Sequence, residues 1–292
     1  MTTINNKHVL MTGGASGLGR LLALRCAALG AAVTIWDLDL AGAEAVAEEA
    51  RGTGAGISAG GAGAIHVFAC DVGDREQVYA RAEEVLATLG PVDILVNNAG
   101  VVSGKLLLEL TDERIELTFR VNALALFWTT KAFLPGMIER GSGHVVTVAS
   151  AAGLVGSPRE TDYAASKFAA VGFNEALRME LRRGAPGIRT TVACPFYVDT
   201  GMFAGVKTRF PLLLPILKEA AVTERILRGI QHDHAQVLLP FMVRTLPAMR
   251  LLPVWAFDRL ADFFGVTTAM DEFTGREEPG AGSGAPERER AG

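Results

Sequence analysis

Short apolar runs alternate with longer amphipathic segments along most of the chain. The apolar runs fall at residues 8–12, 32–36, 65–69, 93–97, 144–149, 188–193 and 236–239. Most of them are rich in β-branched residues and lack polar alternation, as expected of strands that are buried on both faces. The segments between them carry apolar residues at helical spacing. This order predicts an α/β fold, in which a doubly wound parallel sheet of seven strands carries helices on both faces.

The same pattern assigns residues 1–273 to one domain and leaves a tail behind it. The tail, residues 274–292, is rich in Gly, Pro, Glu and Arg and is predicted to be disordered. A glycine-rich stretch near residues 52–63 interrupts the domain and is predicted to be a mobile surface insertion. The domain ends in an apolar extension, residues 238–273.

The apolar extension allows three interpretations. Up to Gly265 it is rich in Leu, Phe, Met and Val, contains Trp255, and is broken by Pro247 and Pro253. Its charges include three interspersed arginines, Arg244, Arg250 and Arg259. The extension could be a subunit contact, a lid over a substrate pocket, or a helix that makes peripheral membrane contact. The sequence has no run of 18 uncharged apolar residues, so no membrane span is predicted. The polar residues 1–7 fit no signal peptide.

Composition excludes several classes of protein. The chain has 292 residues, of which 49% are hydrophobic, and a formal net charge of −4. It can therefore bury a large core, but it has no basic surplus for nucleic-acid binding. Its three cysteines form no C-x-x-C pair and are expected to be reduced core residues of a cytoplasmic protein (Cys26, Cys70 and Cys194). The pair His232 and His234 lacks further ligands, so no metal site is expected.

A glycine-rich loop joins the first predicted strand to the first predicted helix. Residues 12–19 read Thr-Gly-Gly-Ala-Ser-Gly-Leu-Gly, and apolar residues at helical spacing follow over 20–30. Glycines here permit a tight turn and close approach to a pyrophosphate, which the helix N-terminus would bind. The loop therefore predicts a dinucleotide cofactor, with contacts from Gly13, Ser16, Gly17, Leu18 and Gly19.

The residue that ends the second predicted strand indicates which dinucleotide binds. Asp37 lies about 20 residues after the glycines, where a carboxylate accepts hydrogen bonds from the adenosine ribose and repels a 2′-phosphate. No Lys or Arg lies between Gly13 and Gly19, and Leu38 directly follows Asp37. Arg20 belongs to the helix that follows. We therefore expect NAD as the cofactor, with contacts from Asp37 and Leu38.

A tyrosine and a lysine stand one helical turn apart in the segment 163–167. This spacing puts Tyr163 and Lys167 on the same face of a helix. A nearby ammonium favours a phenolate, so Lys167 is expected to lower the pKa of Tyr163 toward the range of a general acid or base near neutral pH. The pair alone is weak evidence, because Y-x-x-x-K occurs by chance in many helices.

Together these motifs resemble the short-chain dehydrogenase/reductase family over roughly residues 7–240. The resemblance implies a single-domain Rossmann fold. It implies that Asp71 and Val72 lie beside the adenine, and that Asn98, Ala99 and Gly100 of an N-N-A-G motif shape the strand next to the cofactor. It also implies a catalytic tetrad, formed by Asn122, Ser150, Tyr163 and Lys167.

The segment after the sixth predicted strand departs from the general family pattern. Where the family usually has Pro-Gly and a downstream Thr near the nicotinamide carboxamide, this chain has Pro195 and then Phe196, with Val198 and Thr200 following. We expect Pro195, Val198 and Thr200 to contact the cofactor and the backbone at Phe196 to differ. The longer stretch through Phe203 resembles the retinol dehydrogenase-like branch, which also contains some hydroxysteroid dehydrogenases.

The resemblance implies hydride transfer between a carbinol carbon and the nicotinamide. Tyr163 would exchange the proton of the alcohol, and Lys167 would lower the tyrosine pKa and hydrogen-bond the ribose. Ser150 would donate to the substrate oxygen, and Asn122 would hold a water that links Lys167 to solvent. Ser150 could instead be a strand-end residue, and Asn122 a buried helix residue that the backbone satisfies.

The expected walls of the substrate site, residues 101–106, 151–158 and 196–210, are mostly apolar. Their apolar members are Leu154, Val155, Phe196, Tyr197, Met202, Phe203, Val206 and Phe210, and they contain no obvious clamp for a carboxylate. A hydrophobic alcohol or ketone of the secondary aryl, steroid or retinoid type is therefore expected. The helices near 111–139 and 161–183 carry extra apolar faces of the kind that pairs subunits in this family, which implies a homodimer or homotetramer.

The same residues allow three alternative functions. A nucleotide-sugar epimerase or dehydratase also uses Tyr-x-x-x-Lys, but it would need a different glycine spacing and a larger C-terminal domain. The second alternative is a non-catalytic NAD-binding or NAD-sensing protein, and the presence of Ser150, Tyr163 and Lys167 together argues against it. The third alternative is an NADPH-dependent ketoacyl-type reductase, and Asp37 argues against it because its carboxylate would repel the 2′-phosphate.

Overall fold

The computed structural model describes residues 1–52 and 63–275. The predicted glycine-rich insertion and the predicted disordered tail lie outside the described residues, except for Gly52, Gly63, Thr274 and Gly275. Both Thr274 and Gly275 donate backbone hydrogen bonds to the carbonyl oxygen of Ala204. The hydrogen-bonded chain therefore extends two residues past Phe273.

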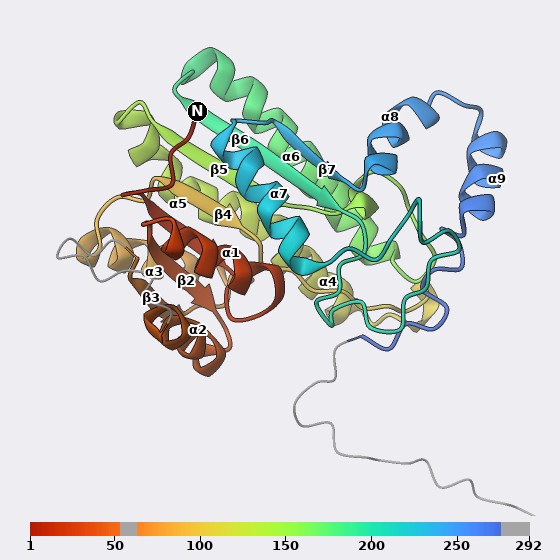
Figure 1. Cartoon of the computed structure of the whole chain (residues 1–292), viewed down its shortest axis with the longest axis horizontal. Helices are drawn as coiled ribbons and strands as arrows, with labels where there is room; N and C mark the ends of the chain where they lie inside the picture. Colours follow the sequence, from red (N-terminus) through yellow and green to blue (C-terminus); the bar gives the residue numbers. More distant parts are fainter. Residues whose placement is uncertain (53–62, 276–292) are drawn as a thin grey trace, which may run out of the picture.

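The described residues contain one seven-stranded parallel sheet, as predicted (Figure 1). Its order is β3-β2-β1-β4-β5-β6-β7, and every pair is parallel. The strands are β1 (His8–Thr12), β2 (Ala32–Asp37), β3 (Ile65–Ala69), β4 (Ile94–Asn97), β5 (Gly143–Val148), β6 (Ile188–Pro195) and β7 (Gln236–Leu239). Since β1 lies between β2 and β4, the strand order reverses there, and such switch points are where ligands bind in open α/β sheets.

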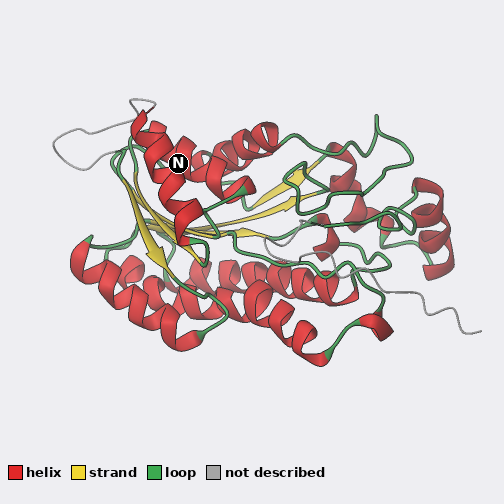
Figure 2. Ribbon diagram, turned by 90° about the horizontal axis from the view of Figure 1, so that it is seen from below, coloured by secondary structure: helices red, strands yellow, loops and turns green. Residues whose placement is uncertain are grey.

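Helices cover both faces of the sheet (Figure 2). One face carries α1 (Gly17–Ala28), α2 (Leu40–Gly52) and α7 (Glu219–Gln231). The opposite face carries α3 (Arg75–Thr88), α4 (Asp112–Phe119), the π-helical turn η2 (Arg120–Leu124), α5 (Ala125–Glu139) and α6 (Thr161–Gly184). The 3₁₀ turns η1 (Leu107–Glu109) and η3 (Ala151–Gly153) lie in the loops before α4 and after β5.

Successive strand residues pack into two separate cores, because side chains alternate across a sheet. In β1, Val9 and Met11 join the cluster beneath α1 and α7, while Leu10 joins the cluster beneath α3 and α5. All three side chains are fully buried. Burying a residue of this size stabilises the fold by about 1.5–3 kcal/mol, so both layers hold the sheet. This two-sided burial fixes the strand ends from which the functional loops leave.

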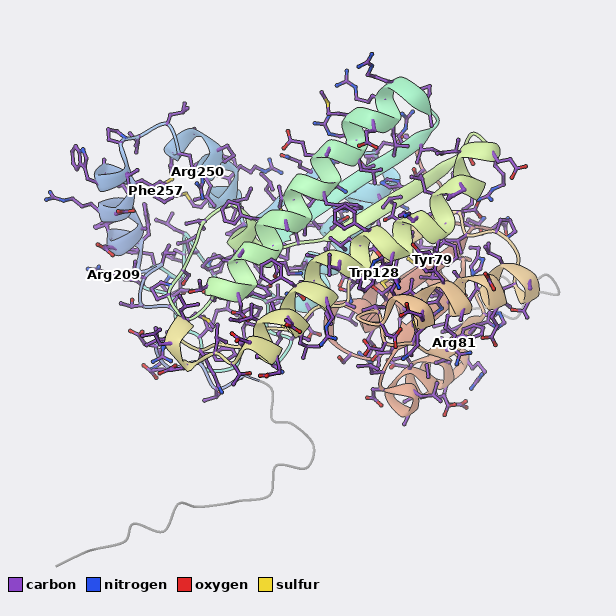
Figure 3. The ribbon with its side chains drawn as sticks, turned by 180° about the vertical axis from the view of Figure 1, so that it is seen from behind. Tyr79, Arg81, Trp128, Arg209, Arg250 and Phe257 are labelled. Atoms are coloured by element: carbon purple, nitrogen blue, oxygen red, sulfur yellow. The ribbon has the colours of Figure 1, made fainter. Side chains whose placement is uncertain are left out.

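The apolar C-terminal extension folds as a separate group of short helices at one end of the molecule (Figure 1). It contains η4 (Phe241–Thr245), α8 (Leu246–Met249) and α9 (Val254–Phe264). Figure 3 shows Arg250 and Phe257 close together there. The Arg250 guanidinium lies 5.0 Å from the ring centroid of Phe168 in α6 and donates to the Leu154 carbonyl at 2.9 Å. Within residues 1–52 and 63–275, no helix has the length and apolarity to cross a membrane.

Candidate active site

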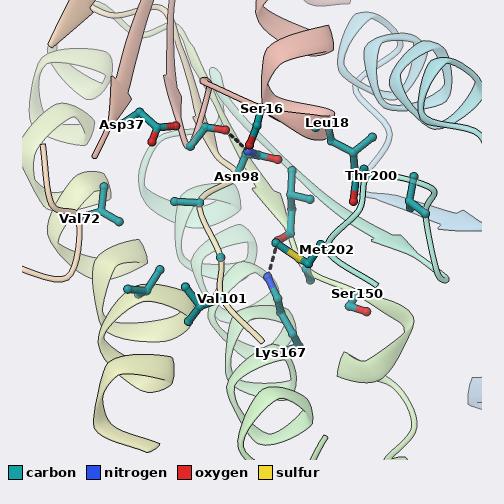
Figure 4. A pocket seen from close by; sticks show the side chains of 18 of the residues that line it. Ser16, Leu18, Asp37, Val72, Asn98, Val101, Ser150, Lys167, Thr200 and Met202 are labelled. Carbon is teal, nitrogen blue, oxygen red and sulfur yellow. Dashed lines mark hydrogen bonds between the residues drawn. The ribbon is translucent and has the colours of Figure 1, made fainter. Parts of the chain in front are cut away.

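A deep cavity opens at the carboxyl ends of the strands, around the point where the strand order reverses. Figure 4 shows Asp37, Asn98, Ser150 and Lys167 projecting toward it from different elements. Every residue predicted to contact the cofactor lines this cavity except Gly19, and among the predicted catalytic residues only Asn122 does not. The full lining is Gly13, Ser16, Gly17, Leu18, Trp36, Asp37, Leu38, Cys70, Asp71, Val72, Asn98, Ala99, Gly100, Val101, Leu117, Val121, Val148, Ala149, Ser150, Tyr163, Lys167, Pro195, Phe196, Val198, Thr200, Met202 and Phe203.

The glycine loop is shaped by contacts that exclude a Cβ. Gly13 has φ +67°, and a Cβ there would lie 2.8 Å from the Ala99 Cα. A Cβ on Gly19 would lie 1.9 Å from the Gly13 carbonyl oxygen and 2.5 Å from Asn98 Nδ2. Gly19 therefore lets α1 approach the loop without itself lining the cavity. The N-terminus of α1 lies at the cavity, which Ser16, Gly17 and Leu18 line, so its first-turn N–H groups can bind an anionic pyrophosphate.

The end of β4 is tied to the glycine loop by a network around Thr12. The Thr12 hydroxyl oxygen accepts from the backbone N–H groups of Asn98 and Ala99 at 3.0 and 3.1 Å. In return, Asn98 Nδ2 donates to the carbonyl oxygens of Thr12 and Gly13 at 3.1 and 2.8 Å. Sequence reasoning had not assigned Thr12 a role in the site, although its position at the end of β1 was a usable signal.

The two Asn residues of the N-N-A-G motif have different surroundings. Asn97 is buried and accepts a hydrogen bond from the Thr129 hydroxyl at 2.7 Å, so it links β4 to α5. Asn98 instead faces the cavity and holds the loop. The motif therefore combines a packing residue with a residue that positions the cofactor loop.

Two carboxylates border the cavity on the side of β2 and β3. Asp37 accepts from the backbone N–H groups of Ala15 at 2.8 Å and Asp39 at 3.0 Å, which fixes its orientation beside the glycine loop. Asp71 accepts from the Gly73 N–H at 2.8 Å. A carboxylate has about four acceptor sites, so these bonds leave both groups able to accept from a ligand. No arginine lines the cavity within the described residues.

Ser150, Tyr163 and Lys167 meet at the base of the cavity. Ser150 follows β5, its hydroxyl oxygen accepts from the Ala152 N–H at 3.1 Å, and its hydroxyl also hydrogen-bonds Tyr163. Tyr163 and Lys167 lie on the same face of α6, as predicted, with the Lys167 Nζ 5.6 Å from the tyrosine ring centroid. Lys167 Nζ also donates to the Val148 carbonyl at 3.0 Å. Both side chains are buried.

The predicted lowering of the Tyr163 pKa is wrong for the polypeptide as it stands. Burial raises the pKa of Tyr163 above its ordinary value, and only a hydrogen bond with Ser150 acts to lower it. Burial also lowers the pKa of Lys167 to about 8, because the charged ammonium is poorly solvated. Desolvation is therefore the main cause of both pKa shifts, which the sequence pattern could not show.

Asn122 lies behind the cavity in the π-helical turn η2, with its side chain already hydrogen-bonded. Its Oδ1 accepts from the Val101 N–H at 2.8 Å, and its Nδ2 donates to the Val101 carbonyl at 2.9 Å and to the Ser166 hydroxyl at 3.0 Å. A Cβ on Gly100 would lie 3.3 Å from Asn122 Oδ1 and 3.4 Å from Lys167 Nζ. Gly100 thus borders both groups. The water that Asn122 was expected to hold between Lys167 and solvent remains a prediction.

The apolar wall of the cavity matches the prediction only in part. Phe196, Met202 and Phe203 line it, but the predicted Leu154, Val155, Tyr197, Val206 and Phe210 do not. Tyr197 and Val206 instead pack against the C-terminal residues Ala269 and Met270. Several lining residues were not predicted, namely Trp36, Cys70, Leu117, Val121, Val148 and Ala149. The spacing of Leu117 and Val121, one turn apart just before Asn122, was a signal for two of them.

The backbone at Phe196 does not require a glycine. In the described part of the chain, the non-glycine residues with positive φ are Asn6, Arg159 and Asp233, so Phe196 has an ordinary conformation. Its N–H donates to the Leu239 carbonyl at 2.8 Å, which anchors the segment to β7. Pro195, Val198 and Thr200 nevertheless line the cavity as predicted.

Comparisons with known proteins agree with this geometry. The family model described as short chain dehydrogenase matches residues 7–209. Human epidermal retinol dehydrogenase 2 is 41% identical over 272 residues, and the match covers 92% of this chain and 86% of that protein. A short-chain dehydrogenase/reductase from Burkholderia phymatum in complex with NAD has a TM-score of 0.74 and 27% identity, covering 86% of this chain and 95% of its own.

A second solved structure differs in the nucleotide that it holds. A metagenomic short-chain oxidoreductase in complex with NADP has a TM-score of 0.66 and 26% identity, covering 81% of this chain and 97% of its own. These likenesses leave the cofactor as one of the two nicotinamide dinucleotides. The matched residues and the identity to a retinol dehydrogenase show that this chain belongs to the short-chain dehydrogenase/reductase family, in its retinol dehydrogenase-like branch, and is an oxidoreductase that uses NAD or NADP.

Proposed function

We propose that the protein interconverts a hydrophobic alcohol and its ketone or aldehyde, with NAD as cofactor and Tyr163 as the general acid or base. The observation that carries this proposal is the placement of Ser150, Tyr163 and Lys167 in one cavity with the glycine loop and Asp37. A bound nicotinamide accepts or supplies the hydride. The chain contributes binding, orientation and the transfer of one proton.

The site suits proton exchange at the oxygen of an alcohol. In oxidation, the O–H proton passes to the Tyr163 phenolate as the hydride leaves the same carbon, and a C=O double bond forms. In reduction, the neutral phenol returns the proton. The Ser150 hydroxyl, which hydrogen-bonds Tyr163, would donate instead to the substrate oxygen. Since burial raises the pKa of Tyr163, the oxidation rate is expected to rise with pH above neutrality.

The preference for NAD is supported by the groups around Asp37. Its carboxylate faces the cavity beside the exposed Leu38, and among the described residues the lining contains no arginine to neutralise a 2′-phosphate. Because a 2′-phosphate would meet like charge at Asp37, NADP is expected to bind more weakly. The measurement is kcat/KM for each nucleotide with one alcohol, and a preference for NADP would contradict this assignment.

The substrate class is inferred from the apolar wall of Phe196, Met202 and Phe203 next to Ser150 and Tyr163. A retinoid, steroid or secondary aryl alcohol presents a single polar group and fits that wall. The name of the human relative, epidermal retinol dehydrogenase 2, supports the retinoid class. A sugar would have to leave hydroxyls unpaired against these side chains.

The remaining proposals concern the state of the protein in the cell. Apolar side chains exposed on α5 and α6, including Phe127 and Met179, support a homodimer or homotetramer.

A cytoplasmic location is proposed from the three unpaired buried cysteines. Peripheral membrane contact through the exposed Leu251 and Trp255 also stays a prediction.

The test of the proposed function is turnover by Tyr163→Phe. The phenol oxygen handles the transferred proton, so kcat for any accepted alcohol should fall by about 10²–10⁴-fold. The Kd for NAD should stay within about threefold of wild type, since the ring remains. Turnover is followed as absorbance at 340 nm over a panel of retinol, steroids, secondary aryl alcohols and alkanols. A wild-type kcat in Tyr163→Phe would overturn the role of Tyr163, and NAD binding without turnover of any alcohol would favour a binding protein.

A further inference from the structure

A second cavity lies beside the active site, beneath the C-terminal helices α8 and α9. Its walls are apolar except for Thr245, and the residues are Ala151, Val155, Phe196, Leu214, Met242, Val243, Thr245, Leu246, Met249, Phe257, Ala261, Phe264 and Val266. The Thr245 hydroxyl already donates to the Met242 carbonyl at 2.7 Å. The cavity therefore offers no hydrogen to a ligand and suits only an apolar group.

One residue contributes to the walls of both this cavity and the active site. Phe196 is the only residue that lines both cavities within the described chain. Ala151, on the wall of the second cavity, directly follows Ser150. The Phe196 backbone is anchored by its hydrogen bond to Leu239, and its ring centroid lies 4.5 Å from that of Tyr197. The ring thus stands as a partition at the position where the family usually has a glycine.

The C-terminal helices supply most of the second cavity. Nine of its thirteen lining residues lie between Met242 and Val266, so the extension covers this cavity rather than standing free of the domain. Arg250 fixes the cover to the domain through its hydrogen bond to Leu154 and its contact with Phe168. Since α8 and α9 contain no fully buried residue, the cavity beneath them is partly open and a ligand can enter it.

We propose that the second cavity binds the apolar end of the substrate remote from the reacting carbon, and that Phe196 limits how far the substrate reaches into it. This inference rests on the proposed function. The substrate is then an elongated molecule with its alcohol or carbonyl at one end and a chain or ring without polar groups at the other. A far end carrying a hydroxyl or carboxylate is excluded, because the cavity would leave it unpaired.

The experiment compares chain-length selectivity among variants that alter the cavity. Selectivity is the ratio of kcat/KM for a long secondary alkanol, 2-dodecanol, to that for 2-butanol. Ala261→Phe fills the cavity from α9 and should lower this ratio by about tenfold or more, the size of an effect expected from lost apolar contact. Phe196→Ala removes the partition and should raise the ratio. Met249→Trp fills the cavity from α8 and serves as a second test if Ala261→Phe does not fold.

Phe241→Ala is the matched control. Phe241 belongs to the same C-terminal segment, is 71% exposed and lines neither cavity, so its removal should leave the ratio unchanged. Binding of N-phenyl-1-naphthylamine, followed by its fluorescence, tests the cavity without turnover. The probe should bind to wild type and to Phe241→Ala, and bind at least about tenfold more weakly to Ala261→Phe.

The outcomes separate the cavity from the reaction. An unchanged ratio in both Ala261→Phe and Phe196→Ala, or probe binding that Ala261→Phe does not weaken, would overturn the proposed subsite. If wild type turns over no alkanol of any length but binds the probe in a manner that Ala261→Phe abolishes, the proposed function fails while the apolar site stands.

Discussion

The cofactor side and the substrate side of the cavity are built in different ways. On the cofactor side, the loop of residues 12–19 is held by backbone groups and by Thr12 and Asn98, with glycines where no Cβ fits. On the substrate side, the segments 196–206 and 241–273 are held mainly by aromatic and aliphatic side chains in contact. A hydrogen-bonded loop with close backbone contacts accepts few other side chains, whereas apolar packing accepts replacement by an apolar side chain of similar volume. The substrate side is therefore expected to tolerate substitution better than the cofactor side.

The aromatic contacts illustrate the construction of the substrate side. The Phe203 ring centroid lies 5.7 Å from that of Tyr163 and 5.2 Å from that of Tyr197, both edge-on. Tyr197 in turn donates to the buried carboxylate of Glu160 at 3.3 Å. This chain of contacts joins the start of α6, which carries Tyr163, to the loop after β6. The bond between Tyr197 and Glu160 therefore lies buried within a largely apolar region.

Gly19→Ala should have the largest effect, because it places a methyl group 1.9 Å from the Gly13 carbonyl oxygen. The loop has to move, and cofactor affinity should fall by more than about 100-fold, with a loss of about 1–3 kcal/mol in the free energy of unfolding. Titration calorimetry with NAD and NADP measures the first effect, and denaturant unfolding the second.

Gly172→Ala in α6 is the matched control for Gly19→Ala. A Cβ at Gly172 meets no atom within 4 Å, so alanine should stabilise the helix by up to about 1 kcal/mol and leave cofactor affinity unchanged. Equal cofactor affinity in Gly19→Ala and wild type would show that the cofactor side is not held as described.

Glu160→Gln should change how stability depends on pH. Burial raises the pKa of Glu160 from 4.5 to about 7, so the folded state keeps a proton that the unfolded state releases. Stability should then fall as pH rises from about 4.5 to about 7, by roughly 3 kcal/mol in total. Glutamine keeps an acceptor for Tyr197 and does not titrate, so the variant should match wild type near pH 4 and exceed it at pH 8.

The measurement is the difference in unfolding free energy between wild type and Glu160→Gln at each pH. The difference is needed because burial lowers the pKa of His144 to about 4, and that group removes stability as pH falls from 6.5 to about 4. The two effects oppose each other in the wild-type curve. A difference that does not grow between pH 4.5 and 7 would refute the role of Glu160.

Phe203→Leu should have the smallest effect of the three. It removes three edge-on aromatic contacts, with Tyr163, Tyr197 and Phe273, each worth about 0.5–1.5 kcal/mol beyond burial, and should lower stability by about 1–2 kcal/mol because leucine keeps part of the packing. The KM for the alcohol should rise while the Kd for NAD stays constant. Phe127→Leu on α5, which loses its contact with Phe173, is the control and should leave KM unchanged. Parallel changes in KM and NAD affinity in Phe203→Leu would contradict the division into two sides.

Much of the fold and of the cofactor side followed from local pattern. All seven strands were predicted within two residues of their observed ends, because strands buried on both faces give uninterrupted apolar runs. Gly13 and Asp37 were predicted from local pattern and Asn98 from the family resemblance, and all three line one cavity. Thr12 was overlooked as a positioning residue, although its position at the end of β1 was a usable signal.

The substrate side followed from the sequence less well. Tyr197 and Val206 were expected in the wall but pack against Ala269 and Met270, which are remote in sequence. The Tyr163 pKa was expected to fall, but burial raises it. In each case the deciding neighbour lies on another element, and spacing along the chain does not report burial.

The sequence by itself determined the parallel sheet, the glycine loop, the acidic end of β2 and the pairing of Tyr163 with Lys167 on one helix face. Each depends on residues within a few positions of one another, where backbone geometry fixes the outcome. Only the tertiary structure decided that Gly19 serves close packing, that Asn122 is already hydrogen-bonded to Val101, and that Phe196 divides two cavities. Those properties depend on solvation and on contacts between distant segments, which exist only once the chain has folded.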